Sequence, residues 1–138
     1  VEHGGWIPRW ADRLVPPQLP DTARLAVHAF SRDTAFVIGG DTLHAYLVPG
    51  HTAGSAVYLF RGILFLGDAV TYSRRGGFRP AKRGFTDDRR QAAASLAELW
   101  RRLPEGAVRY ACTAHAHCAT FSREFTEQVS GNQPAASP

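Results

Sequence analysis

The order of hydrophobic and polar residues divides this chain into a first part with strand-like patterns and a second part with helical ones. Short apolar runs typical of strands cover Leu25–Phe30, Ala35–Ile38, Leu43–Val48, Ser55–Phe60 and Ile63–Leu66. Two turn signals separate neighbouring runs, Gly39-Gly40-Asp41 and Arg61-Gly62, the latter at the two-residue spacing of a hairpin loop. We therefore expect a meander of antiparallel strands.

The run Leu43–Val48 has the period of two that separates the two faces of a strand. Its residues Leu43, Ala45 and Leu47 alternate with His44, Tyr46 and Val48. Because successive side chains of a strand point to opposite faces, we expect the leucine-containing set to be buried and His44 to point outward.

Beyond Asp68 the pattern changes to a period of three and four. Within Asp88–Leu103 the apolar positions at this spacing are Ala92, Leu96, Leu99, Trp100 and Leu103, which predicts an amphipathic helix. Thr86, Asp87 or Asp88 can cap its start, and Pro104 and Gly106 end it. A last strand over Ala107–Cys112 and a short helix over Ser122–Val129 are expected to follow.

This order of elements predicts an α+β fold in which helices cover an outer face of a sheet. We divide the chain into an irregular, proline-rich lead-in over residues 1–24, one domain over residues 25–130 and a flexible tail over residues 131–138. A length of 138 residues is consistent with one domain.

Composition adds little beyond ordinary globular material, with 44% hydrophobic and 20% charged residues. No apolar run approaches the roughly 20 residues that a transmembrane helix needs, and Val1–Trp6 lacks the features of a signal peptide, so we expect a soluble chain of unknown location. Two cysteines, Cys112 and Cys118, are too few for a disulfide framework, and we expect two buried thiols rather than a bridge.

The net charge of +4 includes a local concentration of basic residues between Arg74 and Arg83. We interpret this segment as a solvated, glycine-containing loop. A contact with an anionic substrate or with nucleic acid is the alternative, but it requires an aromatic or helical context that the sequence lacks.

Three segments place residues that can bind a metal directly after predicted strands. They are Pro49-Gly50-His51-Thr52-Ala53-Gly54-Ser55, Phe65-Leu66-Gly67-Asp68 and Thr113-Ala114-His115-Ala116-His117. A histidine between glycines can point an imidazole nitrogen at a cation, and an aspartate adds an oxygen ligand. Zinc accepts both kinds of ligand, so we expect His51, Asp68 and His115 to face one pocket as a divalent-metal site.

The first two of these segments resemble the P-G-H-T-x-G-S and G-D motifs of the metallo-β-lactamase superfamily. The resemblance as a whole covers about Leu25–Phe125. This resemblance implies an αββα sandwich with one or two zinc ions, with iron and manganese as alternative metals. It also implies that His51 binds the first ion, that the catalytic Asp68 bridges both ions, and that His115 binds the second.

The chain departs from the family pattern in two places. The upstream H-x-H-x-D-H signature is absent, and His3 matches only the end of it, so we expect only the C-terminal half of the fold. The last motif offers His117 beside His115, and we favour His115 from its position relative to the strand. A structural zinc knot formed by Cys112, His115, His117 and Cys118 is an alternative that their placement on one short segment disfavours.

For function, the resemblance implies a hydrolase in which a metal-bound hydroxide attacks an ester, thioester, lactam or phosphodiester bond of a small-molecule substrate. The missing ligands would come from a complementary N-terminal half or a partner chain, and we expect neither a membrane nor a nucleic acid as partner. A non-catalytic scaffold or interaction module is the alternative. An anion or nucleic-acid binder through the Arg74–Arg83 segment is a third interpretation, which the sequence favours less.

Overall fold

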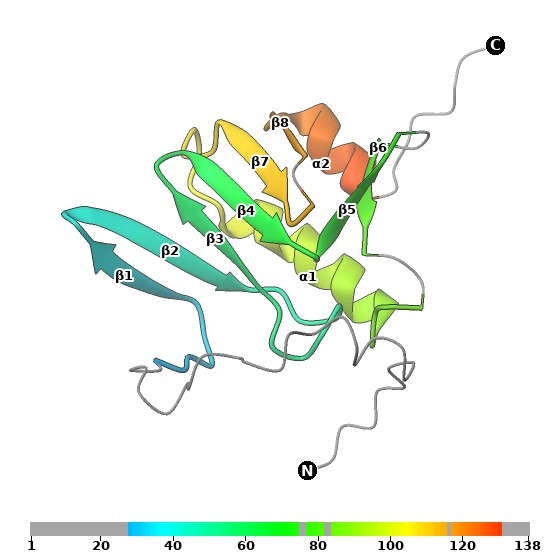
Figure 1. The fold of residues 1–138 in the computed structure, drawn as a ribbon, viewed down its shortest axis with the longest axis horizontal. Helices are drawn as coiled ribbons and strands as arrows, with labels where there is room; N and C mark the ends of the chain where they lie inside the picture. Colours follow the sequence, from blue (N-terminus) through cyan, green and yellow to red (C-terminus); the bar gives the residue numbers. More distant parts are fainter. Residues whose placement is uncertain (1–27, 75–76, 82–83, 116, 131–138) are drawn as a thin grey trace, which may run out of the picture.

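The computed structural model describes residues 28–74, 77–81, 84–115 and 117–130, and Figure 1 shows their arrangement. The strands of its main sheet are β1 (Thr34–Ile38), β2 (Asp41–Leu47), β3 (Ala56–Phe60), β4 (Ile63–Gly67), β7 (Tyr110–Thr113) and β8 (Cys118–Thr120). They lie in the order β1-β2-β3-β4-β7-β8, and a separate hairpin consists of β5 (Val70–Ser73) and β6 (Gly77–Pro80). Two helices, α1 (Arg89–Arg102) and α2 (Arg123–Val129), complete the α+β fold that the sequence predicts.

The predicted meander is confirmed from β1 to β4, where every neighbouring pair is antiparallel. Two-residue turns connect β1 to β2 and β3 to β4, and their residues all have positive φ: 58° and 89° at Gly39 and Gly40, 48° and 82° at Arg61 and Gly62. Such turns match the twist of the strands they join. Arg61 is the non-glycine residue in this conformation, and its guanidinium binds the carboxylate of Asp41.

Strands β4 and β7 are parallel neighbours in the sheet, and the crossover that connects them contains the β5–β6 hairpin and α1. Its register shifts between Phe65 and Gly67, so the chain after β4 leaves the sheet beside the end of β7. This pairing is important for the site, because it brings Asp68 next to the segment that follows β7.

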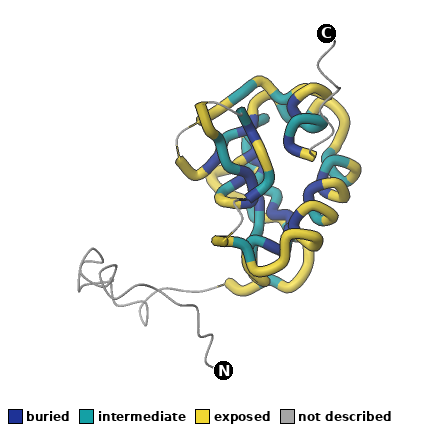
Figure 2. The backbone as a smooth tube through the Cα atoms, turned by 90° about the vertical axis from the view of Figure 1, so that its right-hand side faces the viewer, coloured by how far each residue is buried: buried dark blue, intermediate teal, exposed yellow. Residues whose placement is uncertain are grey.

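Helix α1 begins and ends close to its predicted limits. The carboxylate of Asp88 accepts a hydrogen bond from Gln91 N at 2.9 Å, which confirms one of the three candidate caps. Ala92, Leu96 and Leu99 are buried, as the periodicity predicts. They join a core that also contains Val57, Leu59, Leu64, Leu66 and Ala111 from the sheet. Figure 2 shows the buried segments in dark blue in the interior and exposed backbone on the outside.

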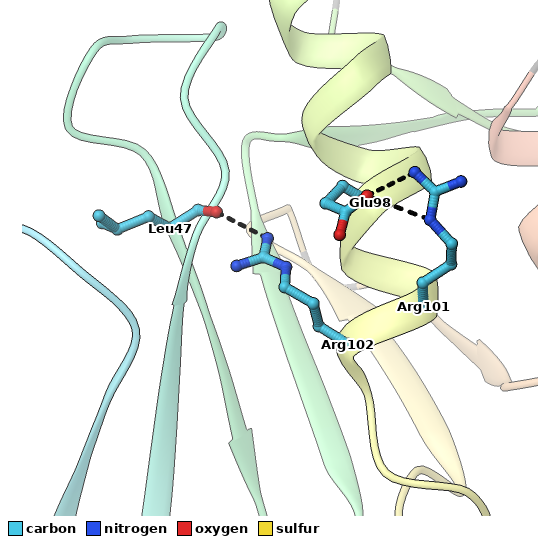
Figure 3. Close-up of polar contacts among 4 residues, drawn as sticks. All are labelled: Leu47, Glu98, Arg101 and Arg102. Carbon is cyan, nitrogen blue, oxygen red and sulfur yellow. Dashed lines mark hydrogen bonds and ion pairs between the residues drawn. The ribbon is translucent and has the colours of Figure 1, made fainter.

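The predicted orientation of β2 is only partly right, because both faces of this strand contain buried residues and Ala45 of the predicted inner set is 0% exposed. Tyr46 and Val48 are buried in the core with α1, and His44 lies on their side of the strand, with its ring stacked on Tyr46 at 6.4 Å. Both faces of this strand are apolar enough that alternation alone does not select the inner one. The C-terminal end of α1 decides it, since Arg102 donates to Leu47 O at 3.0 Å (Figure 3) and its guanidinium also lies over the Tyr46 ring.

The first predicted strand is also wrong where the structure describes it. Residues 28–30 of Leu25–Phe30 are not part of a strand, and the rest of that run lies outside the described residues. The Asp33 carboxylate accepts a hydrogen bond from Leu47 N at 2.9 Å, so a side chain takes the place of further backbone pairing beyond Thr34. The proposed lead-in over residues 1–24 and tail over residues 131–138 lie outside the described residues as well.

The segment interpreted as a loop between Arg74 and Arg83 begins inside a hairpin instead. Val70 and Phe78 of β5 and β6 are buried, and α2 packs on this hairpin through Phe125, whose ring centroid is 5.1 Å from that of Phe78. These strands have only four residues each, which is too short to give a clear alternation. The strand expected over Ala107–Cys112 begins later, at Tyr110, because Ala107 N already donates to Pro104 O in a turn.

The expectation of two free thiols is wrong as well. Cys112 of β7 and Cys118 of β8 are direct cross-strand partners with a Cα–Cα distance of 4.1 Å, and they form a disulfide. Strand β8 was not predicted from the sequence, and without this strand the two cysteines are not placed opposite each other. The disulfide closes the turn that carries His115 and His117, and it excludes the alternative in which both cysteines bind zinc as thiolates.

Candidate metal centre

His51 lies on the loop between β2 and β3, which is fixed to the start of α1. Asp87 N donates to His51 O at 3.1 Å and Asp88 N donates to Gly50 O at 2.9 Å. Gly50 has a φ of 134°, and a Cβ there would lie 2.2 Å from Ala92 N of α1. Only glycine therefore permits this close approach of loop and helix. The His51 ring is half-buried, with Nδ1 3.5 Å from Thr86 Oγ1.

Asp68 follows β4 directly, at the point where the chain turns out of the sheet. Gly67 before it has a φ of 54°, and its carbonyl accepts a hydrogen bond from Ala114 N at 3.1 Å. This bond connects the segment after β4 to the turn after β7. The Asp68 side chain is 48% exposed, so its carboxylate is accessible to a ligand.

His115 lies on the turn between β7 and β8, opposite Asp68. Its Nε2 is 3.2 Å from Asp68 Oδ1, and its side chain is 83% exposed. The turn is held by Thr113 N, which donates to His117 O at 2.9 Å, and by the disulfide between the flanking strands. His115 therefore has a fixed backbone and an accessible ring.

His117 has a different environment from His115. Its Nδ1 is 3.0 Å from His115 O, and its ring stacks on Tyr72 of β5 with centroids 4.0 Å apart and an angle of 21° between the planes. One ring nitrogen and one ring face are thus already in contact with protein. Of the two candidates on this turn, His115 is the one whose ring pairs with Asp68.

The structure brings the three sequence-derived site residues to one cavity of about 420 Å³. Its described lining residues are His51, Asp68, Thr71, Tyr72, Phe85, His115 and His117. Within the described residues, however, no group of three or more histidine, cysteine, aspartate or glutamate side chains is close enough to hold an ion together. Asp68 and His115 form a close pair, and His51 is farther from them. His3 lies outside the described residues.

The Asp68 and His115 side chains lie at hydrogen-bond distance from each other, and this separation is also compatible with a shared ion. Two ligands at zinc distances of about 2.0–2.1 Å in a tetrahedral arrangement are separated from each other by about 3.3 Å. The observed separation of 3.2 Å between Nε2 and Oδ1 is close to this value. Imidazole nitrogen and carboxylate oxygen are also the ligand types that zinc, iron and manganese accept.

The aromatic residues of the cavity, Tyr72 and Phe85, were not among the sequence candidates. Tyr72 belongs to the unpredicted β5, and Phe85 precedes the helix cap as an isolated aromatic residue without periodicity. A second cavity of about 300 Å³ shares Thr71 with the first and is lined by Arg79 and Arg89 among its described residues. Among the described lining residues, Arg79 is the basic residue that comes from the Arg74–Arg83 segment noted in the sequence.

Solved structures with similar folds are metallo-β-lactamase proteins. A metallo-β-lactamase from Pontibacter korlensis aligns with a TM-score of 0.58 and 24% identity over 75% of this chain and 48% of its own. A metallo-β-lactamase family protein from Thermus thermophilus gives 0.55 and 21% over 85% of this chain and 36% of its own. An archaeal superfamily protein from Sulfolobus tokodaii gives 0.54 and 20% over 70% of this chain and 35% of its own.

This chain therefore spans less than half the length of these three structures. No protein-family model matches the sequence, and no curated protein matches it. The likeness confirms the predicted fold class, with one sheet and its helices corresponding to part of the sandwich. None of the helices in the described ranges has the length and apolar character needed to cross a membrane.

Proposed function

We propose that this chain, whose fold resembles part of the metallo-β-lactamase fold, forms the C-terminal half of a metal-dependent hydrolase, with His51, Asp68 and His115 in the metal site. One observation carries the proposal: Asp68 Oδ1 and His115 Nε2 lie 3.2 Å apart in a cavity that His51 also lines. This geometry supports a shared cation. Without a cation, an exposed pair of polar side chains such as this one contributes little to stability.

In this proposal His51 and Asp68 would hold a first ion, and Asp68 and His115 would hold a second. Zinc is the expected metal, and iron and manganese are the alternatives. When bound, zinc supplies Lewis-acid activation of water, whose pKa it lowers to about 7. The turns at Gly50 and Gly67 position the ligands. Asp68 would be the catalytic residue, as the carboxylate that both ions share. The substrate is a small molecule with an ester, thioester, lactam or phosphodiester bond.

The remaining ligands must come from outside the residues described here, since catalytic zinc sites use about three protein ligands per ion. We propose that a complementary N-terminal half, in the same polypeptide or in a partner chain, supplies them. The face of the sheet away from α1 is suited to such a partner. Three exposed hydrophobic side chains lie on it: Ile38 is 52% exposed, Phe65 43% and Tyr110 50%.

Metal retention tests the site directly. The chain and its single variants are loaded with zinc, dialysed and measured for bound metal. We expect His51→Ala and His115→Ala to lower retention at least tenfold, in line with the loss of a ligand. His44→Ala is the matched control, because His44 lies on β2 away from the cavity, and His117→Ala tests the second histidine of the turn.

The outcomes separate the alternatives. Equal losses from His115→Ala and His117→Ala would show that the ligand on this turn is wrongly assigned. If the chain carries no zinc, iron or manganese when it is purified without chelator together with its complementary half, the non-catalytic scaffold is favoured. If the isolated chain, monomeric by light scattering, binds two zinc ions tightly and hydrolyses a generic ester, the complementary half is unnecessary.

A further inference from the structure

Phe85 is an unusual residue in the cavity that holds the candidate ligands. Its side chain is 77% exposed, although a phenyl ring gains from burial. The next two residues contact the His51 loop, which places Phe85 close to this loop. Thr86 Oγ1 lies 3.5 Å from His51 Nδ1, and Asp87 N donates to His51 O at 3.1 Å. Phe85 is thus kept at the edge of the site with its ring uncovered.

The cavity has a second aromatic surface formed by Tyr72 and His117. Their stacked rings, 4.0 Å apart, are supported from behind, because Tyr72 also contacts Phe78 with ring centroids 5.0 Å apart. Phe78 is buried against Phe125 of α2. The pair is therefore anchored to the core and does not depend on a ligand for its position.

The described lining of the cavity contains few charged side chains. Among its described lining residues, Asp68 is the one carboxylate, and no lysine or arginine is present. The polar residues His51, Asp68 and His115 share the cavity with the aromatic ones. A volume of about 420 Å³ lies within the range of small-molecule sites, which combine apolar walls with a few polar groups.

We propose that Phe85 and the Tyr72–His117 pair bind an aromatic group of the substrate beside the bond that is cleaved. This inference rests on the proposed hydrolase function and narrows its substrate class to compounds that carry an aryl substituent next to the bond that is cleaved. Aromatic pairs prefer offset-stacked or edge-to-face contacts, and each contributes beyond the area it buries. Phe85 and the stacked pair both offer ring surface for such contacts.

The test uses the 138-residue chain without metal, so that it is independent of catalysis. Phenylacetamide and acetamide, two neutral amides that differ by a phenyl group, are titrated into labelled protein and followed by NMR chemical shifts. We expect phenylacetamide to bind about tenfold tighter or more, with shifts at Phe85, Tyr72 and His117. Equal affinity for the two amides would overturn the proposal.

Variants assign the effect to the ring. Phe85→Ala should lose about tenfold in affinity for phenylacetamide, and Phe85→Tyr, which keeps an aromatic ring, should retain it. Val37→Ala is the control, since Val37 is 78% exposed, much like Phe85, but lies on β1. Unchanged affinity in Phe85→Ala, with its amide spectrum intact, would also overturn the proposal. Aryl binding without metal retention would instead separate this inference from the hydrolase function, which would then be wrong.

Discussion

The two faces of the six-stranded sheet differ in how completely they are packed. On the face toward α1, Leu64 and Leu66 are fully buried and contact a continuous core. On the other face, Phe65 lies between these two leucines in β4 and is 43% exposed. Because alternate residues of one strand have such different surroundings, the packed face supplies most of the stability of this chain. The open face is left for association.

The candidate site belongs to neither face. His51, Asp68 and His115 lie on turns at the ends of strands, where backbone hydrogen bonds to α1 and between turns fix their positions. Rigid strands and a helix thus support loops that carry the chemistry. The residues that stabilise the fold are therefore different from the residues that form the site, and substitutions in each group test this difference.

The largest effect is expected from Leu64→Ala. It removes a side chain with 0% exposure and should lower the free energy of unfolding by about 2–5 kcal/mol. Its neighbour on the opposite face provides the control, and Phe65→Ala should cost less than about 1 kcal/mol. Urea denaturation of both variants measures the difference. Similar costs would mean that the open face is packed in solution by another molecule or by residues outside the described ranges.

Local signals explain which parts of the fold could be predicted. The Arg61-Gly62 turn and the Asp88 cap act within a few residues, so the sequence shows them directly, and both were found where expected. The orientation of β2 depends on Arg102 at the far end of α1, and the disulfide depends on a three-residue strand. Both need tertiary contacts that a periodic pattern does not contain.

The site shows the same division. The motifs around His51 and Asp68 indicated which residues take part, but their distances depend on the parallel pairing of β4 with β7. His115 was expected in the same pocket, but the sequence gives no distance between its ring and the Asp68 carboxylate. Phe85 was missed because an isolated exposed aromatic residue gives no signal until its neighbours in the fold are known.

A medium effect is expected where the packed face meets the site. The Asp88 carboxylate caps α1, but the bond from this residue to the His51 loop is made by its backbone N–H. Asp88→Ala should therefore lower the free energy of unfolding by about 1 kcal/mol and leave metal retention unchanged. Asp87→Ala, which removes an exposed carboxylate that makes no cap bond, should change stability by less than about 0.5 kcal/mol. A joint loss of stability and metal from Asp88→Ala would show that the site depends on the helix cap.

The smallest effect on stability is expected at Tyr46, which lies at the edge of the packed face. This ring is 8% exposed and lies under Arg102, the last residue of α1. Burial raises the pKa of the Tyr46 hydroxyl above its usual 10.0, the carboxylate of Asp33 raises it further, and Arg102 opposes both. The neutral form is therefore favoured in the folded chain more than in the unfolded one.

The sign of the pH dependence follows from this shift. A folded-state pKa above the unfolded value gives a contribution to stability that is complete below pH 10 and is lost as the pH rises through the folded-state pKa. The Tyr46→Phe variant has no hydroxyl to ionise, so its free energy of unfolding should fall less than that of the parent chain as the pH rises above 10. Below it, the two should agree within about 1 kcal/mol. Urea denaturation at a series of pH values from about 8 to about 11 measures both limits. Curves that stay parallel throughout would show that Tyr46 is hydrated in solution and does not belong to the packed face.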